Sequence, residues 1–399
     1  MYDLDNIAQE FPILKRLAPN GSPLIYLDSA ATALKPQCVI DAVSHFLCSH
    51  TANIHRSVHF LGDEATEAFE GVRDTVACFL NAEPNEIVFV KNTTEGLNLV
   101  ANCFDLNGKR IISSLGEHHS NYLPWGDNTY RLAMNEYGQI DFKELTAELE
   151  KKDVALVSLS FASNVTGNIF DIRKVISLSH DFGAKVLIDA AQAAPHIAID
   201  VEELGCDFLV FSGHKLGAPS GVGVLFGKAE LLENMSLFLK GGSTIESVSS
   251  EGVIVKNAPW KFEAGTPAIE SVIGLGAAIQ FLLEIGMDKV EEKFKRLSKF
   301  TEAEINKKLP NAIVMGVQGE YSSGPYSINI AGVSSHLLAR GLSDRYGICV
   351  RSGYHCAQPL HQHVNAEPSL RISFWIYNSE EDIKQAIDGI VSLINVVSR

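Results

Sequence analysis

Short apolar runs and helical patterns alternate along the chain between about residues 86 and 227. Several runs have the length and the β-branched and aromatic content of buried strands. They lie at residues 87–90, 110–113, 154–159, 186–188, 208–211 and 223–226. Because such alternation is typical of a mainly parallel sheet with helices on both faces, the pattern predicts an α/β fold with one large sheet.

The pattern changes from Gly286 onwards. A charged helical segment is followed by two strand-like runs near residues 327–330 and 348–350, and the chain closes with a helix that begins after Ser379. Asp382 stands three residues after Ser379, as in a capping box. The apolar stripe of the first helix is Val290, Phe294, Leu297 and Phe300, and that of the last is Ile383, Ile387, Ile390 and Ile394. These elements predict a smaller α+β portion. The Ser- and Gly-rich residues 241–252 predict an exposed hairpin or loop.

Chemically informative residues follow two of the predicted strands. Lys215 comes just after the run at 208–211, and Asp189 ends the run at 186–188. Open α/β sheets bind ligands at the carboxyl ends of their strands, where a partly desolvated lysine can lose its proton and form a Schiff base. A carboxylate beside such a lysine suits the ring nitrogen of pyridoxal phosphate. A solvated lysine is the ordinary alternative, and the agreement of two strand ends argues against it.

A third segment predicts a phosphate site. The run at 87–90 leads into Thr93 and Thr94 at the start of a helical pattern, where hydroxyls and free backbone N–H groups bind anions. Ser212 and His214 would add donors from the lysine loop. Taken alone, the Thr-Thr-Glu sequence is more typical of an ordinary helix cap than of a phosphate site.

Together these residues form part of a longer series of motifs. The series comprises residues 26–36 (YLDSAATALKP), 53–59 (NIHRSVH), 93–96 (TTEG), 117–121 (EHHSN), 163–167 (SNVTG), 189–192 (DAAQ), 212–215 (SGHK), 262–267 (FEAGTP) and 351–357 (RSGYHCA). With these motifs in this order, the chain resembles the fold-type I pyridoxal phosphate enzymes of aminotransferase class V. Within that class it is similar to the group II cysteine desulfurases, which comprise the Suf-type desulfurases and selenocysteine lyases.

The resemblance implies a role for each matching residue. Lys215 would bind the cofactor covalently, with Asp189 on the ring nitrogen, Gln192 on the ring hydroxyl and His118 stacked on the ring. Thr93, Thr94, Ser212 and His214 would hold the phosphate, and Thr266 would reach the phosphate of the partner subunit in a homodimer. Asn164, Arg351 and Arg371 would receive the substrate carboxylate, and Cys356 would be the nucleophile that accepts sulfur.

Cys356 decides between the alternatives that remain. Most of the other cysteines lie in apolar or helical contexts, whereas Cys356 lies in a polar, turn-forming segment with Arg351 and His355 nearby. A metal site formed by His355, Cys356, His361 and His363 is a rival hypothesis, but their spacing fits no common zinc pattern. Tyr354 departs from the histidine that often stands there in the family. This departure leaves open the preference between cysteine and selenocysteine.

The resemblance implies conversion of L-cysteine to L-alanine with a persulfide left on Cys356, and L-selenocysteine as a further substrate. It also implies a small sulfur-acceptor protein as partner, in iron–sulfur cluster assembly or another sulfur pathway. One alternative is another class V enzyme, an aminotransferase or epimerase in which Cys356 is not catalytic. Others are a sulfur-carrier scaffold that needs a partner, and a binding protein without pyridoxal phosphate, which the absence of a G-x-G-x-x-G run disfavours.

Length and resemblance together predict the domain organisation. With 399 residues the chain exceeds one typical core. We expect residues 1–16 to pack with the small domain, residues 17–280 to form the large cofactor-binding domain, and residues 281–399 to form the small domain with the nucleophile loop.

Composition limits the kinds of partner and compartment. Hydrophobic residues make up 46% of the chain and charged residues 20%, as in globular proteins. The formal net charge of −15 argues against nucleic acid and membrane surfaces as partners. The N-terminus lacks the features of a signal peptide, and the apolar stretch near residues 271–283 is too short to span a bilayer. Seven cysteines without regular spacing fit a reducing compartment, so we expect a cytoplasmic protein.

Overall fold

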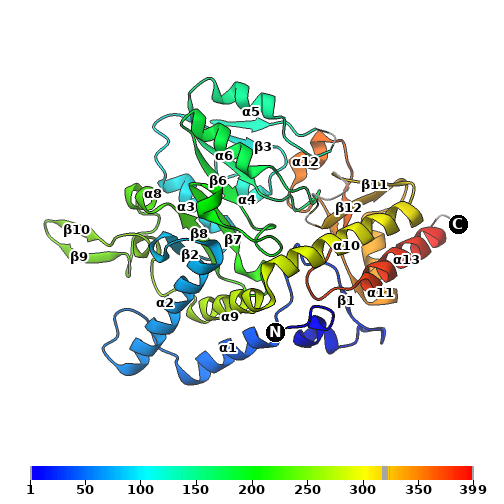
Figure 1. The fold of residues 1–399 in the computed structure, drawn as a ribbon, viewed down its shortest axis with the longest axis horizontal. Coiled ribbons are helices and arrows are strands. Elements are labelled where there is room, and N and C mark those ends of the chain that lie inside the picture. Colours follow the sequence, from blue (N-terminus) through cyan, green and yellow to red (C-terminus); the bar gives the residue numbers. More distant parts are fainter. Residues whose placement is uncertain (1, 136, 317–321, 323, 398–399) are drawn as a thin grey trace.

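The computed structural model describes residues 2–135, 137–316, 322 and 324–397. Its largest sheet has seven strands in the order β2-β8-β7-β6-β5-β3-β4. Figure 1 labels β2, β3, β6, β7 and β8 of this sheet. These are β2 (Ile87–Val90), β3 (Arg110–Ser114), β4 (Thr129–Leu132), β5 (Val154–Ser160), β6 (Lys185–Asp189), β7 (Phe208–Ser212) and β8 (Gly223–Gly227). β8 runs antiparallel to both of its neighbours, and the other pairs are parallel. The predicted mainly parallel sheet is confirmed.

Edge strand β4 is the one strand of this sheet that the hydrophobic pattern did not predict. Of its residues only Leu132 is buried, and the others are partly exposed. A strand at the edge of a sheet contributes few residues to the core, so its sequence carries little of the signal that marks the central strands.

The alternation of side chains along each strand places two hydrophobic layers on opposite faces of the sheet. In β7, Phe208 and Val210 pack into the cluster that contains α3 (Thr93–Cys103), whereas Leu209 and Phe211 pack into the larger cluster on the other face. The larger cluster includes residues of α2 (Phe60–Leu80), α6 (Ile172–Asp181) and α9 (Ile269–Ile285). Helices therefore cover both faces, as predicted.

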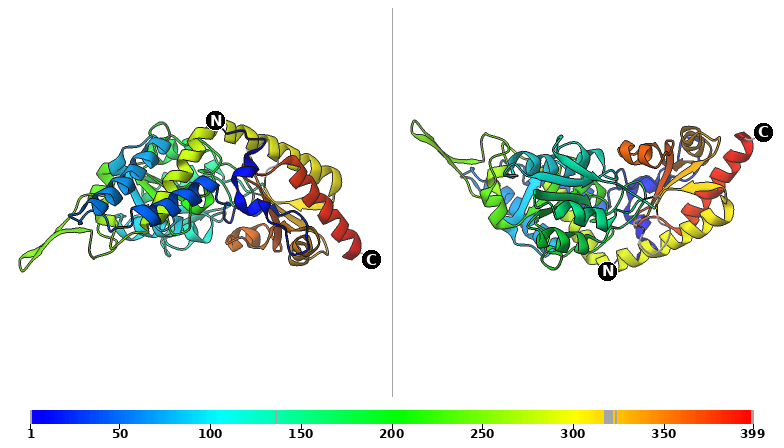
Figure 2. Two further views of the ribbon diagram at one scale, coloured as in Figure 1. Left: turned by 90° about the horizontal axis from the view of Figure 1, so that it is seen from below. Right: turned by 90° about the horizontal axis from the view of Figure 1, so that it is seen from above.

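Further short elements complete this part of the chain. The helices are α1 (Gln37–Ser49), α4 (His119–Tyr122), α5 (Phe142–Leu149), α7 (Val201–Leu204) and α8 (Ala229–Asn234). Strands β9 (Ile245–Ser249) and β10 (Gly252–Val255) form an antiparallel hairpin that projects from the body (Figure 2). The predicted exposed segment at 241–252 is thus a hairpin.

The C-terminal portion has its own four-stranded antiparallel sheet, in the order β11-β12-β15-β14. Its strands are β11 (Ala312–Val314), β12 (Pro325–Ile330), β14 (Arg351–Gly353) and β15 (Ser369–Ser373). Its helices are α10 (Met287–Lys308), α11 (Ser335–Tyr346), α12 (Gln358–His363) and α13 (Glu380–Val397). β1 (Ile25–Tyr26) pairs with β13 (Ile348–Cys349). The capping box of α13 is confirmed, since Ser379 and Asp382 each accept a hydrogen bond from the other's backbone N–H.

The N-terminal segment packs where the two portions meet. The ring of Phe11 lies 4.8 Å from that of Tyr377 and 6.1 Å from that of Phe281, between centroids. Lys293 of α10 donates a hydrogen bond to the backbone carbonyl of Leu4. Among the described residues, no single helix is long and apolar enough to cross a membrane, and only α9 and α10, bent by 78°, pass that test as a pair.

Candidate active site

A cavity of about 270 Å³ lies at the carboxyl ends of the central strands, where the C-terminal portion meets the large sheet. All of the predicted site residues except Thr266 line it. They are Thr93, Thr94, His118, Asn164, Asp189, Gln192, Ser212, His214, Lys215, Arg351, Cys356 and Arg371. Thr93 and Arg371, which are more than 270 positions apart in the sequence, thus line the same cavity.

Lys215 and Asp189 lie on neighbouring strand ends, as the pattern predicted. Lys215 ends a short 3-10 helix that follows β7, and burial lowers the pKa of its amine to about 8, although the nearby Asp189 carboxylate acts in the opposite direction. Asp189 is 5% exposed and accepts a hydrogen bond of 2.9 Å from the backbone N–H of Ala191. Burial raises its pKa, and the charge of Lys215 opposes that rise. A buried carboxylate of this kind is stabilised by a cation placed beside it.

Hydroxyl groups gather at the N-terminus of α3. Ser212 Oγ accepts a hydrogen bond of 2.8 Å from the backbone N–H of Thr93 and lies 2.7 Å from Thr93 Oγ1. Thr94 Oγ1 lies 2.6 Å from Ser120 Oγ. The cap itself is the side chain of Asn92, which accepts from the backbone N–H of Glu95. The two threonine hydroxyls are therefore not the cap, and they face the cavity at a helix end that favours anions.

Ser120 is a cavity residue that sequence reasoning missed. It lies within the quoted motif at 117–121, but nothing in its spacing ties it to Thr94, which is 26 positions away. Its backbone N–H donates to His118 Nδ1 at 3.1 Å, so it also orients the ring of that histidine. Burial, with a further contribution from Lys215, lowers the pKa of His118 to about 3, which leaves the ring neutral near neutral pH.

Glu117 lies behind His118 and was likewise not predicted as a site residue. The carboxyl group is 1% exposed and accepts hydrogen bonds from Ser114 Oγ, Asn121 Nδ2 and both the backbone N–H and the hydroxyl of Ser160. These donors come from the ends of β3 and β5 and from α4. Glu117 therefore ties the turn that carries His118 to two strand ends.

Two arginines also line the cavity. Arg351 of β14 and Arg371 of β15 are directly paired in the sheet register. Arg371 is 2% exposed and donates to the backbone carbonyl of Asn164 at 3.0 Å and to Asp28 at 3.1 Å. Its buried Nε has no hydrogen-bond partner among the described residues. Burial lowers its pKa, and Asp28 opposes that change. Asp28, 3.8 Å from Arg351, was also missed as a residue of this site. A buried guanidinium with an unused N–H group can receive a carboxylate.

Cys356 is exposed and lies in a loop that follows β14. His355 and Cys356 both have left-handed backbone conformations, with φ of 51° and 57°. The rival metal site finds no support in the geometry, because His361 lies against Ala357 and Ser369 while His363 contacts the carbonyl of Met134. Within the described part of the chain, no group of three His, Cys, Asp or Glu residues is arranged to hold a metal ion.

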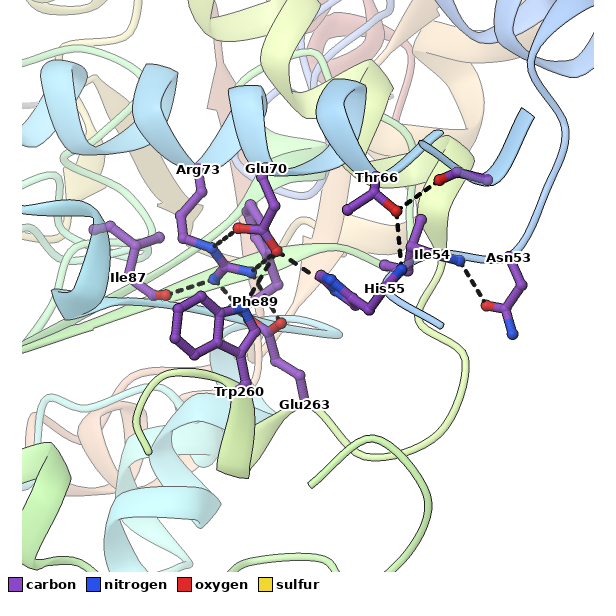
Figure 3. Close-up of polar contacts among 11 residues, drawn as sticks. Asn53, Ile54, His55, Thr66, Glu70, Arg73, Ile87, Phe89, Trp260 and Glu263 are labelled. Atoms are coloured by element: carbon purple, nitrogen blue, oxygen red, sulfur yellow. Dashed lines mark hydrogen bonds and ion pairs between the residues drawn. The ribbon is translucent and has the colours of Figure 1, made fainter. Parts of the chain in front are cut away.

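Thr266 lies outside the cavity, on an exposed segment that follows the β9–β10 hairpin. Figure 3 shows how this segment is anchored: Arg73 of α2 donates to both carboxylate oxygens of Glu263 and also to Glu70. Glu263 in turn accepts from the backbone N–H of Phe89 in β2 at 2.8 Å. The anchor fixes the start of the segment against the body, next to Trp260 and His55, which both contact Glu70.

The donor set fits pyridoxal phosphate. Hydroxyls at a helix N-terminus suit its phosphate, a buried carboxylate suits its ring nitrogen, and a lysine of lowered pKa suits its aldehyde. Gln192 lies at the wall of the same cavity and donates to the backbone carbonyl of Ala30 at 2.9 Å. These groups line one cavity, and Arg371 keeps an Nε–H group without a partner among the described residues.

Comparison with known proteins agrees with this site. Residues 25–386 match the family described as aminotransferase class-V, whose membership implies a pyridoxal phosphate enzyme. A cysteine desulfurase of Escherichia coli K12 is 39% identical over 403 residues and a probable cysteine desulfurase of Halalkalibacterium halodurans is 40% identical over 396, with 98% and 96% of both chains covered. The apo structure of a cysteine desulfurase from Thermococcus onnurineus matches with a TM-score of 0.92 at 33% identity, over 99% of each chain. The chain belongs to the aminotransferase class-V family.

Proposed function

We propose that this protein is a pyridoxal phosphate-dependent cysteine desulfurase, which converts L-cysteine to L-alanine and leaves the sulfur as a persulfide on Cys356. The observation that carries the proposal is that Cys356 lines the same cavity as Lys215, Asp189 and Arg371. The names of the relatives support the same activity. An aminotransferase or epimerase would need no exposed cysteine there.

Different groups that line the cavity bind the cofactor and the substrate. Thr94, Ser212 and His214 would hold the phosphate of the cofactor, and Asp189 would pair with its ring nitrogen. When bound, the cofactor supplies an electron sink that makes the α-proton of the amino acid acidic and the bond from its β-carbon to sulfur labile. Arg371 receives the substrate carboxylate, and this fixes which face of the amino acid meets Lys215.

Lys215 is the group that moves protons. With its pKa lowered to about 8, a substantial fraction of the amine is neutral slightly above neutral pH, so a free Lys215 amine can take up the α-proton of a bound amino acid. His118 remains neutral and would contact the ring of the cofactor. Burial therefore gives the two neighbouring bases different tasks.

Cys356 performs the sulfur transfer. Its thiolate attacks the sulfur of the substrate; the new S–S bond forms as the bond between the β-carbon and sulfur breaks, and the electron pair of that bond stays on carbon. The carbon fragment takes up a proton and leaves as alanine, so one cysteine gives one alanine and one persulfide. The exposure of the loop allows a second thiol, on a small acceptor protein, to take the sulfur on. We infer that this partner serves iron–sulfur cluster assembly or a related sulfur pathway.

The test is a paired measurement of alanine and sulfide from L-cysteine, with a reducing thiol present. Wild-type protein is expected to give equal amounts of both. Lys215→Ala is expected to give neither, and Cys356→Ala to give neither while still binding the cofactor, as seen in its absorption spectrum. Full desulfurase activity in Cys356→Ala would overturn the nucleophile assignment. Alanine absent from wild type, with amino-group transfer in its place, would favour the aminotransferase alternative.

A further inference from the structure

The loop of Cys356 has a backbone that needs support. His355 and Cys356 are consecutive non-glycine residues with φ of 51° and 57°. Residues other than glycine rarely adopt this left-handed backbone conformation. They keep it where neighbouring groups hold the backbone in place. The contacts that hold this pair therefore determine where the thiol of Cys356 lies.

Hydrogen bonds reach the loop from two different parts of the large domain. The carbonyl of His355 accepts a bond of 2.6 Å from Asn164 Nδ2. The carbonyl of Cys356 accepts a bond of 2.7 Å from the backbone N–H of His119. The ring of the same histidine accepts a bond of 3.3 Å at Nε2 from the backbone N–H of Gln358. His119 thus contacts the loop on Cys356 itself and again two residues beyond it.

The ring of His119 has no place in the chemistry described above. His118 lines the cavity, whereas His119 is not among its lining residues and turns towards the loop. The two adjacent histidines come from one turn, which Glu117 ties to the strand ends through its buried hydrogen bonds. Because His118 and His119 belong to the same turn, the contacts of His119 fix the position of the loop relative to the ring of His118.

We propose that His119 is a positioning residue, whose ring holds the nucleophile loop in the conformation that presents Cys356 to the substrate sulfur. The inference rests on the proposed function, in which Cys356 is the nucleophile. The backbone bond from His119 to Cys356 survives substitution of the side chain, so removal of the ring loosens the loop without releasing it. Glutamine can place an amide oxygen near the position of Nε2 and should restore the acceptor.

The first readout is amide hydrogen exchange of the holoenzyme, followed in peptides that contain residues 355–358. His119→Ala is expected to speed exchange in these peptides about fivefold, the effect of one net hydrogen bond, and His119→Gln to restore most of the protection. His363→Ala is the matched control, because that ring contacts the Met134 carbonyl from the other end of α12. The control is expected to leave exchange at 355–358 unchanged.

The second readout is turnover of L-cysteine. His119→Ala is expected to lower kcat about fivefold with KM and cofactor affinity nearly unchanged, and His119→Gln to recover most of the loss. Unchanged exchange at 355–358 in His119→Ala, faster exchange throughout the molecule, or failure of glutamine to do better than alanine would each overturn the proposal. Because hydrogen exchange needs no turnover, it decides the role of His119 even if wild type forms no alanine and the proposed function fails.

Discussion

At the scale of single residues, burial sets the charge state of the groups around the cavity. It lowers the pKa of Lys215 to about 8 and that of His118 to about 3, and it raises that of Glu117 to about 7. Lys215 and His118 could be identified as candidate site residues from the sequence, because a strand end marks the lysine and a family motif marks the histidine. Their charge states could not, because desolvation depends on what surrounds each group in three dimensions.

Glu117 provides a prediction for stability against pH. The folded protein keeps a proton on this carboxyl up to about pH 7, whereas the unfolded chain loses it near pH 4.3. The folded state therefore binds more protons in this range, so the stabilising contribution is full below pH 4.3 and is lost as the pH rises to about 7. The loss is on the order of 3 kcal/mol.

The measurement is urea denaturation of wild type and Glu117→Gln at a series of pH values. Glutamine resembles the protonated carboxyl, and its amide can donate to the hydroxyl of Ser114. The free energy of unfolding of wild type is expected to fall relative to that of the variant as the pH rises through this range. Parallel curves for the two proteins would show that Glu117 does not titrate as described.

Arg371 provides a prediction for substrate capture. Arg371→Lys keeps the charge but removes the planar fork that binds a carboxylate through two hydrogen bonds. KM for L-cysteine is expected to rise about tenfold or more, with a smaller change in kcat. Arg351→Lys is the comparison: Arg351 also lines the cavity, but it is half exposed, so solvent weakens its contact with a carboxylate, and KM is expected to rise about twofold at most. Equal effects in the two variants would contradict the role of Arg371.

At the scale of elements, the pattern of apolar residues located the strands that are buried on both faces. β5, with every residue buried, was predicted almost to its limits, whereas β4, with one buried residue, was not. The amphipathic stripe of α10 also packs as predicted, since Val290, Phe294 and Leu297 are buried. The more apolar surface an element buries, the more clearly its sequence pattern predicts it.

Buried Arg73 carries the prediction at this scale. It joins α2, β2 and the segment before Thr266, and its side chain is 2% exposed. Arg73→Met is expected to destabilise the fold by about 3–5 kcal/mol, because Glu263 would remain buried and unpaired. Adding Glu263→Gln should recover part of that loss, since the double variant buries no unpaired charge there.

Urea denaturation gives the free energy of unfolding of both variants, and Arg110→Met serves as the control. Arg110 also binds a carboxylate through two N–H groups, that of the half-exposed Asp153, and its second partner Glu148 keeps Lys151 as a counter-ion when Arg110 is replaced. The control is expected to lose about 1 kcal/mol or less. If Arg73→Met lowered the free energy of unfolding as little as Arg110→Met does, the charge network in Figure 3 would contribute little to stability.

At the scale of the whole molecule, Thr266 is the predicted site residue that the single chain leaves outside its cavity. The resemblance assigns it to the phosphate of a second subunit, and its exposure on an anchored segment supports that role. A protein that completes its site in this way must work as a dimer, and we expect sedimentation to show one.

Mixed dimers test this arrangement directly. In a hybrid of Thr266→Ala with Lys215→Ala subunits, the only intact lysine lies in the subunit that receives Thr266 from its partner, so half of the wild-type activity is expected. In a hybrid of wild type with a subunit carrying both changes, the site with the intact lysine would face a partner that lacks the threonine hydroxyl, and cofactor release should be faster. Identical cofactor release in the two hybrids would rule out donation between subunits.

Apolar periodicity in the sequence was enough to predict the strands of the large sheet other than β4, and the family resemblance named most of the predicted residues that line the cavity. Periodicity is a local property, and Lys215, Asp189 and Thr94 stand at the ends of elements that it marks. His118, Asn164 and Arg371 have no such local signal, and the resemblance alone indicated them. The contacts of Asp28 with Arg371, of Ser120 with Thr94 and of His119 with Gln358 could be seen only in the folded chain. Asp28 and Arg371 are 343 positions apart and His119 and Gln358 are 239 apart, so no local pattern records their contacts. Long-range packing alone creates them.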